Sequence, residues 1–197
     1  MNILLLGPTP EKLLPCIDSS HNKVFAYNKE IDVQFVSEKK IDVLVSYNYR
    51  SIIQPDVLSL SGLLAFNLHA SLLPFNRGAQ PVLWSILEGT PLGITIHQID
   101  EGIDTGPIIF QKLLTLPDVK KSLQQIYEHV NQELIGLFCN NWPLLVAQKF
   151  NARSQCGDGT FHRSVQAKDF LATLEDSWNT SIEDVKRLYL EYLRRSK

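Results

Sequence analysis

Short runs of apolar residues, each stopped by glycine, proline or polar residues, alternate along this chain with helix-like segments. Asn2–Leu6 ends at Gly7-Pro8, and Val43–Val45 passes into the polar-aromatic stretch Ser46–Tyr49. Continuous apolar runs of this kind are typical of strands buried on both faces of a parallel sheet. The pattern predicts further strands at Val24–Tyr27, Val33–Val36, Gly62–Leu68, Gly93–Ile99 and Ile108–Leu116, and helices at Ser51–Leu60, Pro81–Glu88, Ser122–Val146, Phe170–Leu174 and Ile182–Leu193. Strands that alternate with helices indicate an α/β fold with a mostly parallel sheet.

The length of the chain, 197 residues, is that of one domain with a small appendage. After about residue 150 the composition becomes glycine-rich and polar. We therefore expect residues 1–150 to form the main domain and residues 151–197 a short C-terminal extension packed on it. The apolar stripe of Ile182–Arg195 can dock on its own core or on a second subunit, so the sequence leaves the oligomeric state open.

Charge and composition exclude several classes of partner. A formal net charge of -2 and a pI of about 6.2 argue against nucleic-acid binding, which depends on phosphate neutralisation. No run approaches the roughly 20 apolar residues of a membrane span, and Asn2–Leu6 lacks the cationic region of a signal peptide. The cysteines Cys16, Cys139 and Cys156 are odd in number and lack metal-ligand spacing. We therefore expect reduced thiols, no metal and a cytoplasmic location.

Three polar residues form a candidate site for acyl transfer. Asn67 and His69 are two residues apart, so they point to the same side of a strand, and Asp104 lies in the glycine-punctuated turn Glu101–Gly106. An amine that attacks an acyl carbon creates an oxyanion and an ammonium group. An asparagine amide can donate a hydrogen bond to the oxyanion, and an imidazole can accept the proton of the ammonium group. A carboxylate can orient the imidazole.

From the residues alone, a purely structural role for these three residues remains open. His69 can equally be a hydrogen-bonded structural histidine, and Asp104 can be a simple turn former. His97, inside a predicted strand, is interpreted as a core histidine, and Trp84 as a core residue. His162 is compatible with either a structural or a functional role. No two histidines have the usual spacing of metal ligands.

Four motifs in fixed order resemble the signature of the folate-dependent formyltransferases. They are NLHASLLP at Asn67–Pro74, Arg77-Gly78, GITIH at Gly93–His97, and Asp104-Thr105-Gly106. The segment Ser46–Ile53 is similar to the small sugar N-formyltransferases. Gly159–His162, followed by Lys168–Phe170, is similar to the sugar enzymes and to the formylation domain of linear gramicidin synthetase. The resemblance implies a Rossmann-like sheet of the formyltransferase type, here with a trimmed N-terminal half.

The resemblance also implies a co-substrate, N10-formyltetrahydrofolate, and roles for named residues. By position, Asn67 would bind the formyl oxygen, His69 would take the proton and Asp104 would orient His69. The implied folate contacts are Tyr47, Asn48, Tyr49, Arg50, Leu72, Leu73, Pro74, Ile99, Asp100 and Gly102. The implied contacts of the acceptor amine are Phe75, Asn76, Arg77, Gly78 and His162.

Differences from the larger family members restrict the acceptor amines that we expect for this chain. Gly7-Pro8-Thr9-Pro10 replaces the phosphate loop expected of a glycinamide ribonucleotide enzyme, and the last ~45 residues are too short for the second domain of a tRNA enzyme. The expected function is therefore formylation of an amino sugar, expected to be nucleotide-linked. Alternatives are another small-molecule or carrier-bound amine, water as acceptor, and a non-catalytic folate-binding module.

Overall fold

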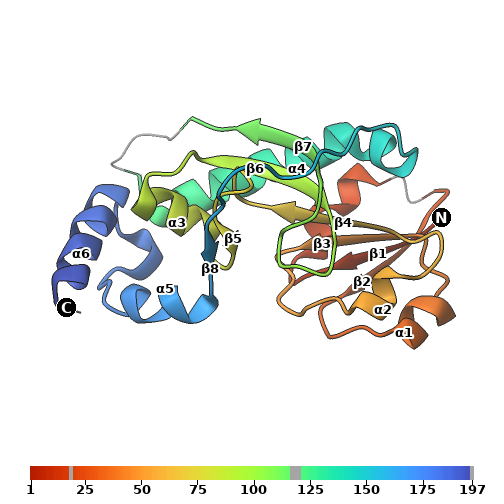
Figure 1. The fold of residues 1–197 in the computed structure, drawn as a ribbon, viewed down its shortest axis with the longest axis horizontal. Helices are drawn as coiled ribbons and strands as arrows, with labels where there is room; N and C mark the ends of the chain where they lie inside the picture. Colours follow the sequence, from red (N-terminus) through yellow and green to blue (C-terminus); the bar gives the residue numbers. More distant parts are fainter. Residues whose placement is uncertain (18–19, 116–120, 196–197) are drawn as a thin grey trace. The chain divides into compact units, whose positions relative to one another are not determined.

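The computed structural model describes residues 1–17, 20–115 and 121–195 (Figure 1). Its strands are β1 (Asn2–Leu6), β2 (Lys23–Tyr27), β3 (Val43–Tyr47), β4 (Leu64–His69), β5 (Arg77–Gly78), β6 (Gly93–Gln98), β7 (Ile108–Leu113) and β8 (Phe161–His162). Its α-helices are α1 (Val33–Glu38), α2 (Pro55–Leu58), α3 (Pro81–Glu88), α4 (Leu123–Val146), α5 (Ser164–Leu171) and α6 (Ile182–Arg195). Short 3-10 helices lie at Pro10–Lys12, Leu14–Cys16 and Ser177–Asn179.

Six strands form one mixed sheet in the order β2-β1-β3-β4-β6-β7. β1 pairs in parallel with β2 and β3, and β3 pairs in parallel with β4, whereas β6 runs antiparallel to β4. The predicted α/β class with a mostly parallel sheet is thus confirmed, with β6 reversed. All five residues of β3 are buried, which is the burial expected for a strand covered on both faces.

Residue contacts divide the chain into two compact units, which we describe separately. The first unit comprises Met1–His69, Thr95–Gln111 and Leu134–Gln155. The second unit comprises Ala70–Ile94, Lys112–Glu133 and Cys156–Lys197. Both units interleave along the sequence; the predicted boundary near residue 150 stays a prediction.

In the first unit, α1 and α2 cover one face of β1 and β3. Leu4 and Leu6 of β1 and Leu44 of β3 alternate onto that face, where they meet Val36 of α1 and Val57 of α2. At the carboxyl edge of the same strands, Gly7 has φ +138°, and a Cβ there would overlap the carbonyl oxygen of Tyr47. Glycine is therefore what lets the chain leave β1 so close to the end of β3.

Three predicted elements differ from the structure. Val33–Val36, predicted as a strand, begins helix α1, because the Asp32 carboxylate accepts a hydrogen bond from the Phe35 amide at 2.7 Å and caps the helix. The helix predicted at Ser51–Leu60 is only Pro55–Leu58, and the one predicted at Phe170–Leu174 instead begins at Ser164 and ends at Leu171. Residue Leu116 of the predicted strand Ile108–Leu116 lies outside the described residues.

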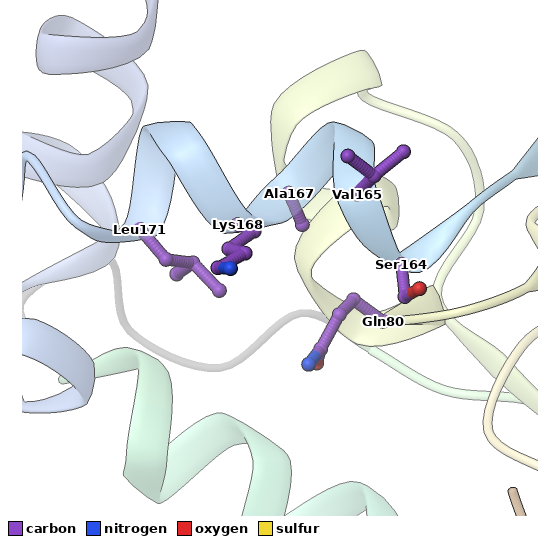
Figure 2. A pocket seen from close by; sticks show the side chains of 6 residues that line it. All are labelled: Gln80, Ser164, Val165, Ala167, Lys168 and Leu171. Carbon is purple, nitrogen blue, oxygen red and sulfur yellow. The ribbon is translucent and has the colours of Figure 1, made fainter.

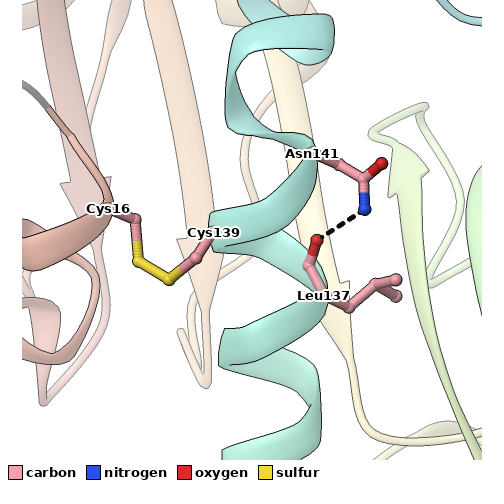
Figure 3. The surroundings of a disulfide bond; sticks show 4 residues. All are labelled: Cys16, Leu137, Cys139 and Asn141. Carbon is pink, nitrogen blue, oxygen red and sulfur yellow. Dashed lines mark hydrogen bonds between the residues drawn. A yellow bond between two sulfur atoms is a disulfide. The ribbon is translucent and has the colours of Figure 1, made fainter.

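The cysteines also differ from the prediction of reduced thiols. Cys16 and Cys139 are joined by a disulfide bond, with Cα atoms 4.7 Å apart (Figure 3). Cys156 is exposed. The two half-cystines are separated by 123 residues, and only the packing of the Leu14–Cys16 turn beside α4 brings them together. Sequence spacing therefore carried no signal for this pair. One turn further along α4, Pro143 lies inside the helix, and Asn141 donates its side-chain amide to the Leu137 carbonyl at 2.8 Å.

In the second unit, helix α6 docks on its own core. Ile182 and Val185 are fully buried, and the Tyr189 ring lies 6.2 Å from that of Trp84 and 5.0 Å from that of Phe170. The sequence left two partners open for the apolar stripe of Ile182–Arg195, the chain's own core and a second subunit. The structure shows the stripe packed on the chain's own core. Among the described residues, no helix has the length and apolarity that would cross a membrane.

Candidate active site

The register of β4 against β6 assembles a polar cluster in the first unit. Asn67 pairs with His97 and His69 pairs with Thr95, and directly paired residues of antiparallel strands project to the same face. Asp104 follows β6 by a turn and reaches back to this face. The predicted proximity of Asn67, His69 and Asp104 is therefore confirmed, and His97 joins them.

The Asp104 carboxylate is the centre of this cluster. Its Oδ1 accepts a hydrogen bond from the Asn67 amide at 2.8 Å, and its Oδ2 lies 3.5 Å from His69 Nδ1. Oδ1 is also 3.5 Å from His97 Nε2. The side chains of His69 and Asp104 are only 7% and 12% exposed, so their electrostatic interaction is weakly screened by solvent. This geometry orients the His69 ring through its Nδ1.

Hydrogen bonding defines the tautomer of neutral His97 and the orientation of Asn67. His97 Nδ1 lies 2.7 Å from the Gln98 carbonyl oxygen, so Nδ1 carries the hydrogen and Nε2 is an acceptor. The Asn67 amide lies 3.1 Å from that Nε2 and donates to it. Both amide hydrogens of Asn67 are thus engaged, one by His97 and one by Asp104.

The turn that carries Asp104 is built by the residues around it. Asp104 has φ +54°, in the left-handed region that aspartate tolerates better than most residues. Asp100 Oδ1 accepts hydrogen bonds from the Thr105 hydroxyl at 2.7 Å and the Gly102 amide at 3.2 Å. A Cβ at Gly106 would overlap the Gln98 carbonyl oxygen, so only glycine fits there.

Sequence reasoning missed Gln155, which clamps this turn. Its side-chain amide donates to the Asp104 carbonyl at 2.8 Å and to the Gly106 carbonyl at 2.9 Å. Gln155 thereby holds the backbone on both sides of Thr105. A lone glutamine 51 residues from Asp104 has no sequence signal, whereas His97 had one in its place on the predicted strand.

We expect Gln155→Glu to lower kcat for the reaction of this site by about tenfold, because two backbone hydrogen bonds of roughly 1 kcal/mol each lose their donor. The KM values should stay unchanged, and the melting temperature should fall by about 4–8 °C, the shift expected for ~2 kcal/mol in a chain of this size. Steady-state kinetics with thermal unfolding measure the three quantities. The matched control is Gln148→Glu, an exposed position in the same region. A lower melting temperature with unchanged kcat would contradict the positioning role.

The residues predicted to bind folate fall into two groups in the first unit. Tyr47 is buried, Asn48 and Arg50 are exposed, and Asn48 has φ +55° at the end of β3. The Tyr49 hydroxyl donates to the Lys29 carbonyl at 2.8 Å, and partial burial raises the pKa of that hydroxyl, so it remains a donor. Asp100 anchors the turn described above, and Gly102 is exposed in it.

A cavity of about 300 Å³ lies in the same unit. It is lined by Leu58, Leu63, Leu64, Ala65, Phe66, Gln98, Ile99, Asp100 and Pro107. Two of the predicted folate contacts, Ile99 and Asp100, therefore face one mostly apolar hollow. Its size is at the lower end of small-molecule sites.

The remaining predicted folate contacts lie in the second unit. Leu73 is buried, and Leu72 and Pro74 are half-buried. Leu72 packs on Gly93, where a Cβ would come within 2.7 Å of the Leu72 side chain. The peptide bond between Leu73 and Pro74 is cis.

The predicted acceptor residues are also brought together in the second unit. Arg77 and Gly78 form β5, which pairs in parallel with Phe161 and His162 of β8. The Ser71 hydroxyl donates to the Phe75 carbonyl at 2.6 Å. Asn76 is fully buried, with its side-chain amide 2.8 Å from the Ser85 hydroxyl, 2.7 Å from that of Thr90 and 2.9 Å from that of Thr160. Asn76 therefore holds the loop from inside.

His162 is buried against Trp84. The two rings stack with centroids 4.0 Å apart, and His162 Nε2 lies 3.2 Å from Glu88 Oε1. Its side chain is 8% exposed. The interpretation of Trp84 as a core residue agrees with its 4% exposure. Among the described residues, no group of three or more His, Cys, Asp and Glu side chains is arranged to hold a metal ion.

The chain matches a known protein family. The family model described as formyl transferase matches residues 16–137, which is more than half of the chain. The chain therefore belongs to the formyltransferase family.

Individual relatives show which formyltransferases this chain is similar to. The crystal structure of the formyltransferase PseJ from Anoxybacillus kamchatkensis, in complex with UDP-4,6-dideoxy-4-formamido-L-AltNAc and tetrahydrofolate, has a TM-score of 0.86 and 37% identity, covering 94% of this chain and 97% of that one. Methionyl-tRNA formyltransferase of Synechococcus sp. (strain WH7803) is 32% identical over 159 residues, or 75% of this chain and 46% of that protein. The bifunctional polymyxin resistance protein ArnA of Wigglesworthia glossinidia brevipalpis is 29% identical over 160 residues, or 79% of this chain and 23% of that protein. The chain thus spans less than half the length of these two relatives.

Proposed function

We propose that this chain transfers the formyl group of N10-formyltetrahydrofolate to the amine of a nucleotide-linked amino sugar. The observation that carries the proposal is the Asp104 carboxylate, which holds Asn67 and His69 on one face of the sheet. The likeness to PseJ supports the donor and the acceptor class, because that structure holds tetrahydrofolate and a UDP-linked formamido sugar. The expected cytoplasmic location stays a prediction.

In the proposed reaction, the amine nitrogen bonds to the formyl carbon and forms a tetrahedral oxyanion. His69 Nδ1 faces Asp104, so its hydrogen lies there and the lone pair is on Nε2, which takes the proton from the attacking nitrogen. The bond between the formyl carbon and N10 then breaks, its electron pair stays on N10, and N10 takes the proton from protonated His69 as tetrahydrofolate leaves. The 3.5 Å between His69 and Asp104 is long for a hydrogen bond, and such contacts commonly tighten when substrate binds.

The proposed role of Asn67 is donation to the oxyanion. Because both of its amide hydrogens are engaged by His97 and Asp104, this role requires the amide to exchange one of them for the oxyanion. Exchange of the longer contact, 3.1 Å to His97, keeps the hydrogen bond to Asp104 and the orientation of His69.

The test of this function is product formation from a panel of amines. The chain is incubated with N10-formyltetrahydrofolate and UDP- or dTDP-linked amino sugars, with glycinamide ribonucleotide and methionyl-tRNA as other acceptors. Mass spectrometry should detect the addition of one formyl group to an amino sugar. A product from only one of the other acceptors would refute the sugar assignment. Formate release without an amine would indicate a hydrolase, and tetrahydrofolate binding without any turnover a non-catalytic module.

We further propose that the cavity lined by Ala65 and Ile99 holds the pterin ring. Ala65→Trp places an indole in a cavity of about 300 Å³ and is expected to raise KM for N10-formyltetrahydrofolate by about tenfold or more, with a smaller effect on kcat. Steady-state kinetics and calorimetry with tetrahydrofolate measure the effect, with thermal unfolding to verify the fold. Leu113→Trp, at a position 64% exposed, is the control. Unchanged tetrahydrofolate affinity in folded Ala65→Trp would place the pterin elsewhere.

A further inference from the structure

The disulfide bond between Cys16 and Cys139 joins two elements of the first unit that are far apart in the sequence (Figure 3). Cys16 ends the short 3-10 helix on the path that leaves β1, and Cys139 lies in the part of α4 that belongs to the first unit. Neither residue belongs to the cluster around Asp104, and neither lines the cavity of about 300 Å³. The chemistry described above therefore leaves this bond without a role.

Both half-cystines lie where a small thiol can reach them. Cys16 and Cys139 are each half-buried, and Asn140, the next residue on α4, is exposed. A disulfide bond breaks when a thiolate attacks one of its sulfur atoms, so exchange with other thiols requires access to a sulfur. The surface position of this pair provides that access without unfolding of the first unit.

Noncovalent packing holds the same two elements in place. Leu13 and Ile17, on either side of the turn that carries Cys16, are buried, and the Cys16 amide donates to the Leu13 carbonyl at 3.1 Å. Phe138 and Trp142 are buried on α4 beside the other half-cystine. Because these contacts do not depend on the bond, the Cα atoms should stay near their separation of 4.7 Å after reduction, and the thiols can re-form the bond.

The bond closes a long segment of the chain. The two half-cystines are 123 residues apart, and the entropy that a crosslink removes from the unfolded chain grows with the length of the closed loop. The folded chain keeps its packing with or without the bond. The oxidation state of the pair should therefore change the stability of the first unit much more than its shape.

The second unit has no crosslink of its own, since Cys156 is its single cysteine. Noncovalent contacts hold its C-terminal helices, and a cavity of about 460 Å³ lies between α5 and the start of α3 (Figure 2). An effect of the disulfide bond should therefore be largest in the first unit, and α5 is an internal reference within the same chain.

We propose that Cys16 and Cys139 form a reversible redox site that sets the stability of the first unit. On oxidation, the two thiols lose two protons and two electrons to a low-molecular-weight disulfide of the glutathione type, which is reduced to two thiols. One cysteine thiolate attacks the small disulfide and releases one small thiol, and the other cysteine then attacks the mixed disulfide and releases the second. An excess of small thiol reverses both steps. Stability is measured without formyl transfer, so this inference does not rest on the proposed function.

The test compares the full chain after oxidation with glutathione disulfide and after reduction with dithiothreitol. Thiol titration of the acid-quenched, unfolded chain should detect one thiol, that of Cys156, in the oxidised chain and all three cysteines in the reduced chain. The melting temperature should be about 5–15 °C higher for the oxidised chain, the shift expected for a loop of this length in a chain of this size. Hydrogen exchange should slow more in β1 than in α5 on oxidation.

Single variants assign the effect to this pair. Cys16→Ser and Cys139→Ser are small changes at half-buried positions, so each should fold, melt like the reduced chain and lose the difference between the two treatments. Cys156→Ser is the matched control and should keep that difference. Three titrating thiols in the oxidised chain, equal melting temperatures, or a difference that persists in Cys139→Ser would overturn the proposal. A bond that dithiothreitol reduces only in the unfolded chain would also overturn it, because the pair would then be closed to exchange.

Discussion

Replacing His69 with alanine is expected to lower kcat for formyl transfer by about 10²–10⁴-fold, the usual contribution of a positioned acid–base group. The ring is oriented by Asp104 at Nδ1, and no other described side chain in the cluster presents an imidazole lone pair in the same way, because the Nε2 of His97 accepts from Asn67. Rapid-quench or steady-state measurement of formyl product gives the rate.

The pH profile separates this role from a structural one. In the unmodified chain, the decline of kcat/KM at low pH should report protonation of the base, and His69→Ala should lose that decline. His21→Ala, an exposed histidine, serves as control and should keep both rate and profile. Near-normal turnover in His69→Ala would end the proposed mechanism.

Asp104→Asn is expected to reduce kcat by about 10³–10⁴-fold with little change in volume, by analogy with other histidines that lose their orienting carboxylate. Oδ1 accepts from Asn67 and Oδ2 faces His69 Nδ1, so each carboxylate oxygen has a hydrogen directed at it. An asparagine presents NH₂ at one of these positions. Either it opposes the Asn67 amide, or His69 changes tautomer and its Nε2 loses the lone pair.

A double variant tests whether the two groups act as one unit. His69→Ala combined with Asp104→Asn should be slower than His69→Ala by much less than the loss in Asp104→Asn alone, because the carboxylate then acts only through its hydrogen bond from Asn67. Multiplicative losses would show that Asp104 has a separate role. Glu101→Gln, an exposed carboxylate in the same turn, is the matched control and should retain full activity.

The strand pattern and the two-residue spacing of Asn67 and His69 were sufficient to predict the buried sheet and the side on which these residues meet. The contribution of His97 was not predictable in the same way, because it depends on the antiparallel register of β4 and β6, which places His97 opposite Asn67. Local patterns define the period of a strand but not its pairing partner.

Long-range contacts explain the other features that could not be predicted from the sequence. Gln155 reaches the Asp104 turn across 51 residues, and Cys16 meets Cys139 across 123. Each contact depends on where a loop or helix packs after the sheet has formed, and neither residue type shows a local signal for it. The prediction of a strand at Val33–Val36 was wrong for a different reason. The helix cap at Asp32 outweighed the strand preference of two β-branched residues.

The link between Asn76 and Thr160 has a consequence for engineering. The Asn76 amide and backbone nitrogen both meet the Thr160 hydroxyl, the Arg77 amide donates to the Thr160 carbonyl, and a Cβ at Gly159 would overlap the carbonyl oxygen of Pro74. The loop after β4 and the C-terminal segment are therefore a matched pair, although 84 residues separate them. A chimera with a single crossover between these segments would combine mismatched halves, so exchange of acceptor preference between related enzymes calls for both segments to be transplanted together.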